Sequence, residues 1–451
     1  MEKQVECRGA LLRQGVHGPP EYGIARAPRQ PHFGCQRPLC YNHRPERKGL
    51  PNGVERVIVV LLIGLGLGGG LALVAGHLYL YRRLGRDLSR VRFLRVLVGV
   101  ALAALSLCAL LAMVLPRKVP EHGFGPLVVV GLMWIGIVFY LLACLLFADL
   151  VRLVLRLVRR RCVLSAEQES GELDRRQFMA RVVAGVTVAS TSGIVSFGVH
   201  SALSEIATPE VVVPLARLPR ALSGFRIALL CDLHLGPVLG RGFVREVVER
   251  TNALSPDLIA IVGDLADGPS EVIGRVATDL GRLRAPHGVF FVTGNHEYYF
   301  GVEGWLRFVR GLGIRVLANE HVRIGDGPKG ANFTLAGVHD ASGGRFEPAF
   351  AADLPRALAG RLPEDEIVLL AHQPKQVDEA ARQGVGLQLS GHTHGGQLMP
   401  LGLAVTLDQP YLSGLHRHGP RSQIYVSRGT GCWGPPMRVG APPEITNVVL
   451  I

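Results

Sequence analysis

The chain has 451 residues, 48% of them hydrophobic, and a formal net charge of +13. This apolar content is too high for one ordinary soluble domain, and the length leaves room for a membrane part and a full catalytic domain. Much of the excess of Lys and Arg lies beside apolar runs, where it indicates membrane topology, so we expect no nucleic-acid partner.

Residues 1–56 are rich in Arg, Pro and Gly and have no apolar periodicity, which predicts a disordered basic extension. Their cysteines and histidines have no zinc-finger spacing, so we predict no zinc site in this segment. The eight cysteines of the whole chain are scattered, and their positions imply no disulfide framework.

Four apolar stretches then predict a transmembrane region over residues 57–203 with about four helices. Each stretch has about 20 or more predominantly apolar residues, enough to cross ~30 Å of hydrocarbon. They run from Val57 to Tyr81, from Leu94 to Leu115, from Pro126 to Leu150 and from Val182 to Leu203. The fourth is richer in Gly, Ser and Thr, so a buried core helix is the alternative interpretation there.

Arginines are unevenly distributed around these stretches. The connections after the first and third are arginine-rich, whereas the loop between the second and third offers only Arg117 and Lys118. The positive-inside rule makes both arginine-rich connections cytoplasmic, and a multi-pass membrane protein follows with residues after about 204 on the outer side. The segment from Arg175 to Met179 resembles a twin-arginine export signal, with a plain basic helix flank as the alternative.

Residues 204–451 have the texture of a separate α/β domain. We predict strands over residues 225–231, 258–262, 289–293, 333–338, 367–371, 387–390, 423–427 and 446–451, with helices such as 242–253 and 302–312 between them. Near-continuous apolar strands that alternate with helices imply sheets covered on their outer faces. Two packed sheets with helices outside would accommodate this number of strands.

Metal-ligating residue types recur where these strands should end. The motifs are Asp232-Leu233-His234, Gly263-Asp264, Gly294-Asn295-His296-Glu297, the isolated His372, and Gly391-His392-Thr393-His394. They supply two aspartates, an asparagine and five histidines, enough to hold two divalent cations and leave one imidazole for proton transfer. Residues two apart on an extended backbone would project from one face into the site, and glycines beside them would allow close approach. The motifs predict a metal-dependent hydrolase, whereas Cys231 should face the core.

The order of these motifs, with Asp267 completing a Gly-Asp-x-x-Asp pattern, resembles the calcineurin-like metallophosphoesterase superfamily over residues 220–451. The likeness is to its membrane-anchored or exported bacterial branch, supported by Ala371-His372-Gln373-Pro374 and by Arg428-Gly429-Thr430-Gly431. The resemblance implies a four-layer α-β-β-α sandwich with a dinuclear metal site at the strand ends.

The resemblance also implies a ligand set for each ion. One metal would be bound by Asp232, His234, Asp264 and His394, and the other by Asp264, Asn295, His372 and His392, with Asp264 as the bridge. Mixed nitrogen and oxygen ligands suit Mn, Fe, Zn or Co. Two such ions can bind phosphoryl oxygens and lower the pKa of a shared water, which predicts hydrolysis of a phosphoester.

His296 is the imidazole left over from these sets. The resemblance makes it the proton donor to the leaving oxygen or a stabiliser of charge on the phosphoryl group, oriented by Asp267. Glu297 is an alternative orienting residue. His339, Asp340 and Arg345 are candidates for lining the substrate pocket, although a plain turn is the commoner explanation of their segment.

The substrate is constrained less closely than the reaction. Gly268 stands where serine/threonine phosphatases of this superfamily have Arg, which disfavours a phosphoprotein. A site beside the outer leaflet favours phosphorylated envelope material, such as a glycolipid, a lipid-linked sugar pyrophosphate or a wall polymer. A cytoplasmic nucleotide or nucleic-acid phosphodiesterase is one alternative. A non-catalytic membrane receptor or scaffold is another, although no ligand position is degraded.

Overall fold

The computed structural model describes residues 71, 73–86, 91–118, 125–162, 172–204, 206–325 and 330–451. The predicted basic extension and most of the first predicted membrane span lie outside these residues. The described end of that span is helical at residues 71 and 73–80 and leads into the π-helix η1 (Tyr81–Arg86). The Tyr79 hydroxyl in this segment donates a hydrogen bond of 2.6 Å to Asp149, which ties it to a later helix.

Three long helices follow in the described part of the chain: α2 (Arg92–Lys118), α3 (Gly125–Cys162) and α4 (Glu172–Leu203). Each contains a stretch long and apolar enough to cross a membrane, over Arg92–Met113, Gly125–Val158 and Gln177–Leu203. The second, third and fourth predicted spans fall within these helices, and the fourth is therefore a candidate span as well. Arg175 and Arg176 lie in the first turns of α4, where the export interpretation stays a prediction.

Two six-stranded mixed sheets form the C-terminal half. The first has the order β1-β12-β2-β3-β4-β5 and the second the order β10-β11-β9-β8-β7-β6. Strands β2, β3 and β4 are parallel to one another, as are β7, β8 and β9, so the carboxyl ends within each group point the same way. The strands are β1 (Glu210–Val213), β2 (Phe225–Leu230), β3 (Leu258–Val262), β4 (Val289–Val292), β5 (Arg315–Val316), β6 (Glu320–Gly325), β7 (Asn332–Gly337), β8 (Ile367–Leu370), β9 (Leu387–Ser390), β10 (Gly414–His418), β11 (Ser422–Val426) and β12 (Thr446–Leu450).

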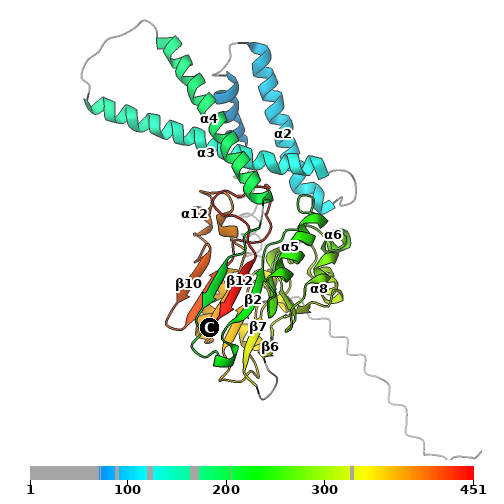
Figure 1. Cartoon of the computed structure of the whole chain (residues 1–451). Coiled ribbons are helices and arrows are strands. Elements are labelled where there is room, and N and C mark those ends of the chain that lie inside the picture. The colour runs from blue at the N-terminus through cyan, green and yellow to red at the C-terminus, as the bar shows by residue number, and fades with distance from the viewer. Residues whose placement is uncertain are drawn as a thin grey trace, which may run out of the picture. The chain divides into compact units, whose positions relative to one another are not determined.

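Alternation along the strands divides the core into layers. On β2, Ile227 and Leu229 enter the apolar layer between the two sheets, whereas Ala228 and Leu230 face the helices that cover the first sheet. Those helices are α5 (Arg241–Ala253), α6 (Ser270–Ala277) and α8 (Val302–Gly311), which Figure 1 shows together on one side of the strands. A third apolar layer joins the second sheet to α10 (Leu354–Ala357) and α11 (Val377–Arg382).

The predicted four-layer sandwich is therefore confirmed, and Cys231 lies in the layer between the sheets, as expected. All eight predicted strands exist within one residue of the predicted ends. The four unpredicted strands are β1, β5, β6 and β10, and they include the outermost strands of both sheets. β5 has only two residues and β10 is polar and partly exposed, so neither has the apolar run by which buried strands are found.

Loops at the carboxyl ends of the strands contact the long helices. Met437 and Leu398 form an apolar cluster with Tyr140 of α3, whose hydroxyl donates a hydrogen bond of 3.0 Å to the carbonyl of Met399. The Arg438 N–H donates a hydrogen bond of 2.8 Å to the carbonyl of Gly198 on α4. A Cβ at Gly136 of α3 would lie 2.7 Å from the Met437 side chain, so glycine is needed for this close approach. These loops are thus bonded directly to the membrane-span candidates.

Candidate metal centre

The predicted site residues follow five strands from both sheets. Asp232 and His234 come after β2, Asp264 after β3, Asn295 and His296 at the start of α7 (Asn295–Tyr299) after β4, His372 after β8, and His392 and His394 after β9. All are buried except His392, which is half-buried, although every one carries polar side-chain atoms. A buried polar cluster requires partners or bound ions, because an unpaired charge in the interior is costly.

The backbone at these residues is not extended. The prediction that strand alternation puts both residues of each pair on one face is therefore wrong. Asp232, His234, Asp264, His392 and His394 all have positive φ, between 45° and 71°. They therefore turn through the left-handed region, which costs a non-glycine residue about 1 to 3 kcal/mol unless the surroundings hold it there. The tight turns, and not strand alternation, aim both members of each pair into the site.

Neighbouring glycines make room for the turned carboxylates. A Cβ at Gly294 would lie 2.2 Å from Oδ1 of Asp264, and a Cβ at Gly391 would lie 2.5 Å from Oδ2 of Asp232. Both distances are far below van der Waals contact. The close approach predicted for the glycines of the motifs is therefore present, and any other residue at these two positions would displace a carboxylate.

A first cluster joins Asp232, His234 and His394, with one ligand atom from each within 4.8 Å of the others. The two imidazoles face each other through Nε2 atoms that are 3.0 Å apart. The carboxylate of Asp232 is held in turn by the backbone N–H of His392, which donates to both of its oxygens at 3.0 Å. Two imidazoles and a fixed carboxylate that converge in this way form a ligand set suited to a divalent cation.

A second cluster joins Asp264, His372 and His392 within the same limit of 4.8 Å. His372 Nδ1 lies 2.9 Å from the carbonyl oxygen of Val262, which fixes that nitrogen as the donor and leaves the lone pair of Nε2 toward the site. Two buried atoms here have no hydrogen-bond partner in the described structure, namely Nε2 of His372 and Oδ1 of Asn295. Unpartnered acceptors aimed into a polar site are what a second cation would satisfy.

The two clusters meet at Asp264. Its Oδ2 lies 3.2 Å from Nε2 of His372 in the second cluster and 3.7 Å from Nε2 of His234 in the first. A carboxylate in this position can serve two ions at once, so the chemistry and spacing of the residues fit a dinuclear centre of histidine and aspartate ligands. The structure brings together all the predicted aspartate and histidine ligands. The side-chain oxygen of Asn295, the remaining predicted ligand, is also buried.

His296 lies at the edge of both clusters and contacts Asp267. Its Nδ1 is 2.7 Å from Oδ1 of Asp267, and the same oxygen is 2.8 Å from Nδ1 of His234. Burial opposes a charged imidazole, but the carboxylates of Asp264 and Asp267 outweigh it and raise the pKa of His296 to about 9. Cations bound at Asp264 would oppose that shift. Asp267 thus contacts both imidazoles, its role in orienting His296 stays a prediction, and the contact with His234 was not foreseen.

Glu297 has a different place from the one suggested for it. Its carboxylate accepts hydrogen bonds from the backbone N–H groups of Asp264, Leu265 and Gly294, at 3.1, 2.7 and 2.6 Å. These bonds join the loops after β3 and β4, and they leave Asp267 as the residue in contact with His296. Burial and the nearby Asp264 raise the pKa of Glu297 to about 7. Glu297 therefore holds the backbone of Asp264 in position.

Comparison with known proteins agrees with this geometry. Residues 225–396 match the family described as calcineurin-like phosphoesterase. An uncharacterized metallophosphoesterase of Aquifex aeolicus is 36% identical over 52% of this chain and 87% of its own length. The chain belongs to the calcineurin-like metallophosphoesterase family.

Other relatives of this metallophosphoesterase come from animals and bacteria. A transmembrane protein with metallophosphoesterase domain from Danio rerio is 38% identical over 58% of this chain and 61% of its own length. An uncharacterized metallophosphoesterase of Helicobacter pylori is 41% identical over 56% of this chain and 66% of its own length. The chain therefore spans somewhat less than two thirds of these relatives, and they do not single out a bacterial branch.

Arg438 is a residue of the metallophosphoesterase centre that sequence reasoning missed. It is fully buried, and its guanidinium donates hydrogen bonds to the carbonyls of Gly431, His394 and Ala441 at 3.1 to 3.2 Å. Its Nη2 also lies 3.3 Å from Nδ1 of His394. Burial lowers the pKa of Arg438 to about 10. Nothing in the local sequence distinguishes this arginine, because its partners are backbone carbonyls that only the fold brings together.

The pocket-lining candidates occupy structural positions. Asp340 is buried and accepts hydrogen bonds from the side chains of Gln373 and Ser342, at 2.9 and 2.5 Å. His339 Nδ1 lies 2.9 Å from the hydroxyl of Tyr298. Arg345 is exposed. The turn interpretation of this segment therefore accounts for the first two residues.

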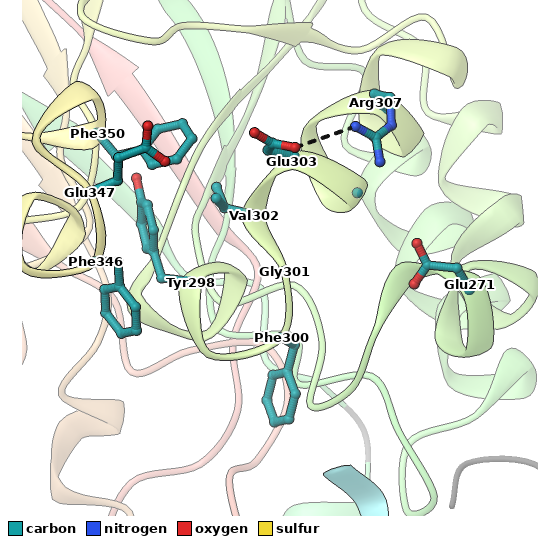
Figure 2. Close-up of a pocket in the computed structure, with 11 residues that line it drawn as sticks. Glu271, Tyr298, Phe300, Gly301, Val302, Glu303, Arg307, Phe346, Glu347 and Phe350 are labelled. Carbon is teal, nitrogen blue, oxygen red and sulfur yellow. Dashed lines mark ion pairs between the residues drawn. The ribbon is translucent and has the colours of Figure 1, made fainter. Parts of the chain in front are cut away.

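A cleft of about 410 Å³ is lined in part by Tyr298 of α7, and Figure 2 shows aromatic and acidic side chains around it. Glu303 at its rim forms an exposed ion pair with Arg307 at 3.7 Å. Glu271 and Glu347 also line it. Arg307 lines the cleft too and offsets the charge of Glu303, so two carboxylates, Glu271 and Glu347, are left to repel an anionic phosphoester.

The bridging position predicts the first measurement. Asp264→Asn should lower the bound metal from two equivalents to one or fewer, because a neutral amide cannot neutralise two cations. Elemental mass spectrometry of the purified full-length protein measures the number of bound metal equivalents. Asp279→Asn is the matched control, since Asp279 is also largely buried but pairs with Arg241 outside the centre, at 2.9 Å. Two full equivalents in Asp264→Asn would exclude the bridge.

Proposed function

We propose that this protein is a metal-dependent phosphoesterase that hydrolyses a phosphate ester or pyrophosphate at its dinuclear centre. The observation that carries the proposal is the pair of buried His/Asp clusters that share Oδ2 of Asp264. Bound divalent cations would supply charge to hold phosphoryl oxygens and to make hydroxide available at neutral pH. Mn, Fe, Zn and Co all suit the ligands.

The chain's residues divide the binding of the ions between them. In the proposal Asp232, His234 and His394 hold one cation, and Asn295, His372 and His392 hold the other. Asp264 serves both. The fixed tautomer of His372 and the backbone N–H of His392, which donates to both oxygens of Asp232, hold these ligands in place before the substrate arrives, so little reorganisation is needed.

His296 is proposed as the proton donor to the leaving oxygen. Asp267 contacts Nδ1 of His296, which keeps that side of the ring occupied and leaves Nε2, 3.9 Å from Oδ2 of Asp264, toward the reacting group. The carboxylate of Asp267, which would bind no cation in this proposal, favours the protonated ring, the form that a general acid requires. As the bond from phosphorus to the leaving oxygen breaks, the Nε2 proton moves to that oxygen.

The contacts between the domain and the helices support an outer location for the catalytic domain. Its loops contact the last turns of the apolar stretch of α2, the first half of α3 and the last turns of α4. The arginine-rich segments flank the opposite ends of the same helices, at residues 82–95, 152–161 and 175–181. If those segments are cytoplasmic, the catalytic domain is outside, and a membrane-anchored enzyme of the envelope is the proposal.

The two alternative functions have less support. For a nucleotide or nucleic-acid phosphodiesterase, polyanionic substrates would need cationic side chains, yet no Lys or Arg lines the cavity at the centre among the described residues. A non-catalytic scaffold has no need to keep two converging ligand clusters and the unpartnered nitrogen of His372. Hydrolysis of a phosphate ester or pyrophosphate of another kind fits the site better than either alternative.

The proposed activity has a direct test in the purified full-length protein. Nitrophenyl phosphate and bis-nitrophenyl phosphate should be hydrolysed when Mn, Fe, Zn or Co is supplied, and chelation should remove that activity. Asp264→Asn should lower the rate at least about a hundredfold, and Asp279→Asn should not. Absence of hydrolysis with all four metals in a folded, metal-loaded protein would argue for the scaffold.

The role of His296 predicts a dependence on the leaving group. His296→Ala should keep both metals and slow turnover by about 10² to 10⁴, the range for a lost general acid. The loss should be smaller for nitrophenyl esters than for alkyl esters, because a good leaving group needs less protonation. Equal losses for both classes of ester would instead assign His296 to phosphate binding, and loss of one metal would make it a ligand.

Reporter fusions test the proposed side of the membrane. Alkaline phosphatase fused after Ile451 should be active, because it folds into its active form only when exported, and the same enzyme fused after Arg160 should be inactive. A cytoplasmic reporter at the two junctions gives the reciprocal pattern if the proposal holds. Activity of the phosphatase only at Arg160 would put the catalytic domain inside the cell and restore the nucleotide alternative.

A further inference from the structure

A cavity of about 560 Å³ connects the metal centre to the long helices. Its inner end is formed by His234, Asp267 and His296, the last of which is the proposed proton donor. Its outer end is formed by side chains of α2 and α3. The wall between them comes from the end of α7 and from loops of the catalytic domain, including Tyr299, Phe300, Leu398, Leu401 and Trp433.

The helical wall of this cavity is apolar and regular. Val128, Leu132, Ile135 and Phe139 of α3 line it at spacings of four, three and four residues, so they form one face of the helix. Ala112 and Met113 of α2 complete this wall. The same two helices are long and apolar enough to cross a membrane, so the cavity is continuous with segments that would contact lipid chains.

Apolar side chains are also exposed on the loops that reach the cavity, which Leu401 and Trp433 line. Leu401, Leu403 and Leu407, around α12 (Gly402–Val405), expose 43%, 67% and 89% of their surface, and Trp433 exposes 54%. Exposed leucines and a tryptophan gathered beside membrane-span candidates are typical of a segment that lies in the bilayer interface. The entrance would thus lie at the level where lipid headgroups meet acyl chains.

We propose that the substrate is a lipid phosphoester whose leaving group carries the apolar chain, with the phosphoryl group at the metal centre and the chain along α3. The proposal rests on the phosphoesterase function and names its substrate class. The position of His296 indicates how the substrate is oriented. His296 lines the cavity and is proposed to protonate the leaving oxygen, so the leaving group lies in the cavity. A sugar or nucleotide there would leave its hydroxyls against Leu132 and Ile135 without partners.

The reaction balances without any further reactant. Water adds to phosphorus, the bond from phosphorus to the lipid oxygen breaks, and the proton from His296 gives the lipid alcohol. The proton that the water releases restores His296. Phosphate, or the phosphorylated headgroup of a diester, leaves toward solvent, and the alcohol returns to the membrane along the cavity.

Chain length is the variable that tests this inference. Full-length protein in phosphatidylcholine nanodiscs, loaded with metal, is assayed on n-alkyl phosphates from ethyl to decyl. The kcat/KM should rise by roughly fourfold for each added methylene that enters the cavity, since burial contributes about 0.8 kcal/mol per CH₂, and should then reach a plateau. Release of inorganic phosphate measures each rate.

A matched pair of variants separates the cavity from simple partition into the bilayer. Leu132→Trp fills the cavity and should lower the ratio of kcat/KM for decyl to ethyl phosphate by at least tenfold. Val130→Trp places the same side chain on an exposed part of α3 outside the cavity and should keep the wild-type ratio. Partition is equal for both variants. Met113→Trp, on α2 across the cavity, replaces Leu132→Trp if that variant does not fold.

The outcomes distinguish the substrate class from the function. Hydrolysis that is independent of chain length, or an equal ratio in Leu132→Trp and Val130→Trp, would overturn the lipid inference and leave a phosphoesterase for soluble esters. No hydrolysis of any ester in the metal-loaded protein would overturn the phosphoesterase itself. A kcat/KM that rises with chain length, and that loses this rise only in the cavity-filling variant, supports both the phosphoesterase function and the lipid substrate.

Discussion

Oδ2 of Asp264 is the atom on which the centre depends, because both ligand clusters converge on it. It lies 3.2 Å from Nε2 of His372 and 3.7 Å from Nε2 of His234, in an interior where Asp264 is only 2% exposed. Two buried aspartates, Asp232 and Asp264, need positive charge close by, and protonated imidazoles are one source of it. Divalent cations are a stronger source, so metal binding and histidine protonation compete for the same lone pairs.

The convergence on Asp264 strains the backbone, and the surrounding fold offsets that strain. Eight described non-glycine residues have positive φ, and five of them are proposed ligands, so the strain is concentrated at the site. Glu297 bonds to three backbone N–H groups of the loops after β3 and β4, and Arg438 bonds to the carbonyls behind His394. A buried carboxylate and a buried guanidinium thus hold the turns from opposite sides of the centre.

The sequence predicted what depends on local pattern. Apolar runs located eight of the strands, and motif order singled out the aspartates and histidines that form the two clusters, because both signals lie in short segments. It did not predict β5 or β10, which lack an apolar run, nor the buried partners of Arg438, which are distant backbone atoms. It gave the wrong reason for the paired motifs, because residue spacing does not reveal a left-handed turn. The shared contact of Asp267 with two imidazoles also required the fold.

One loop links the chemistry to the membrane-span candidates. Met437 packs against α3, the Arg438 N–H bonds to Gly198 of α4, and the Arg438 guanidinium bonds to the carbonyl of His394. Only one residue therefore separates a helix contact from a proposed metal ligand. Buried hydrogen-bonded groups resist displacement, so a shift of α3 or α4 must either break these bonds or move His394. The helices accordingly do more than tether the domain: they form a wall of its cavity and, through Arg438, support the proposed ligand His394.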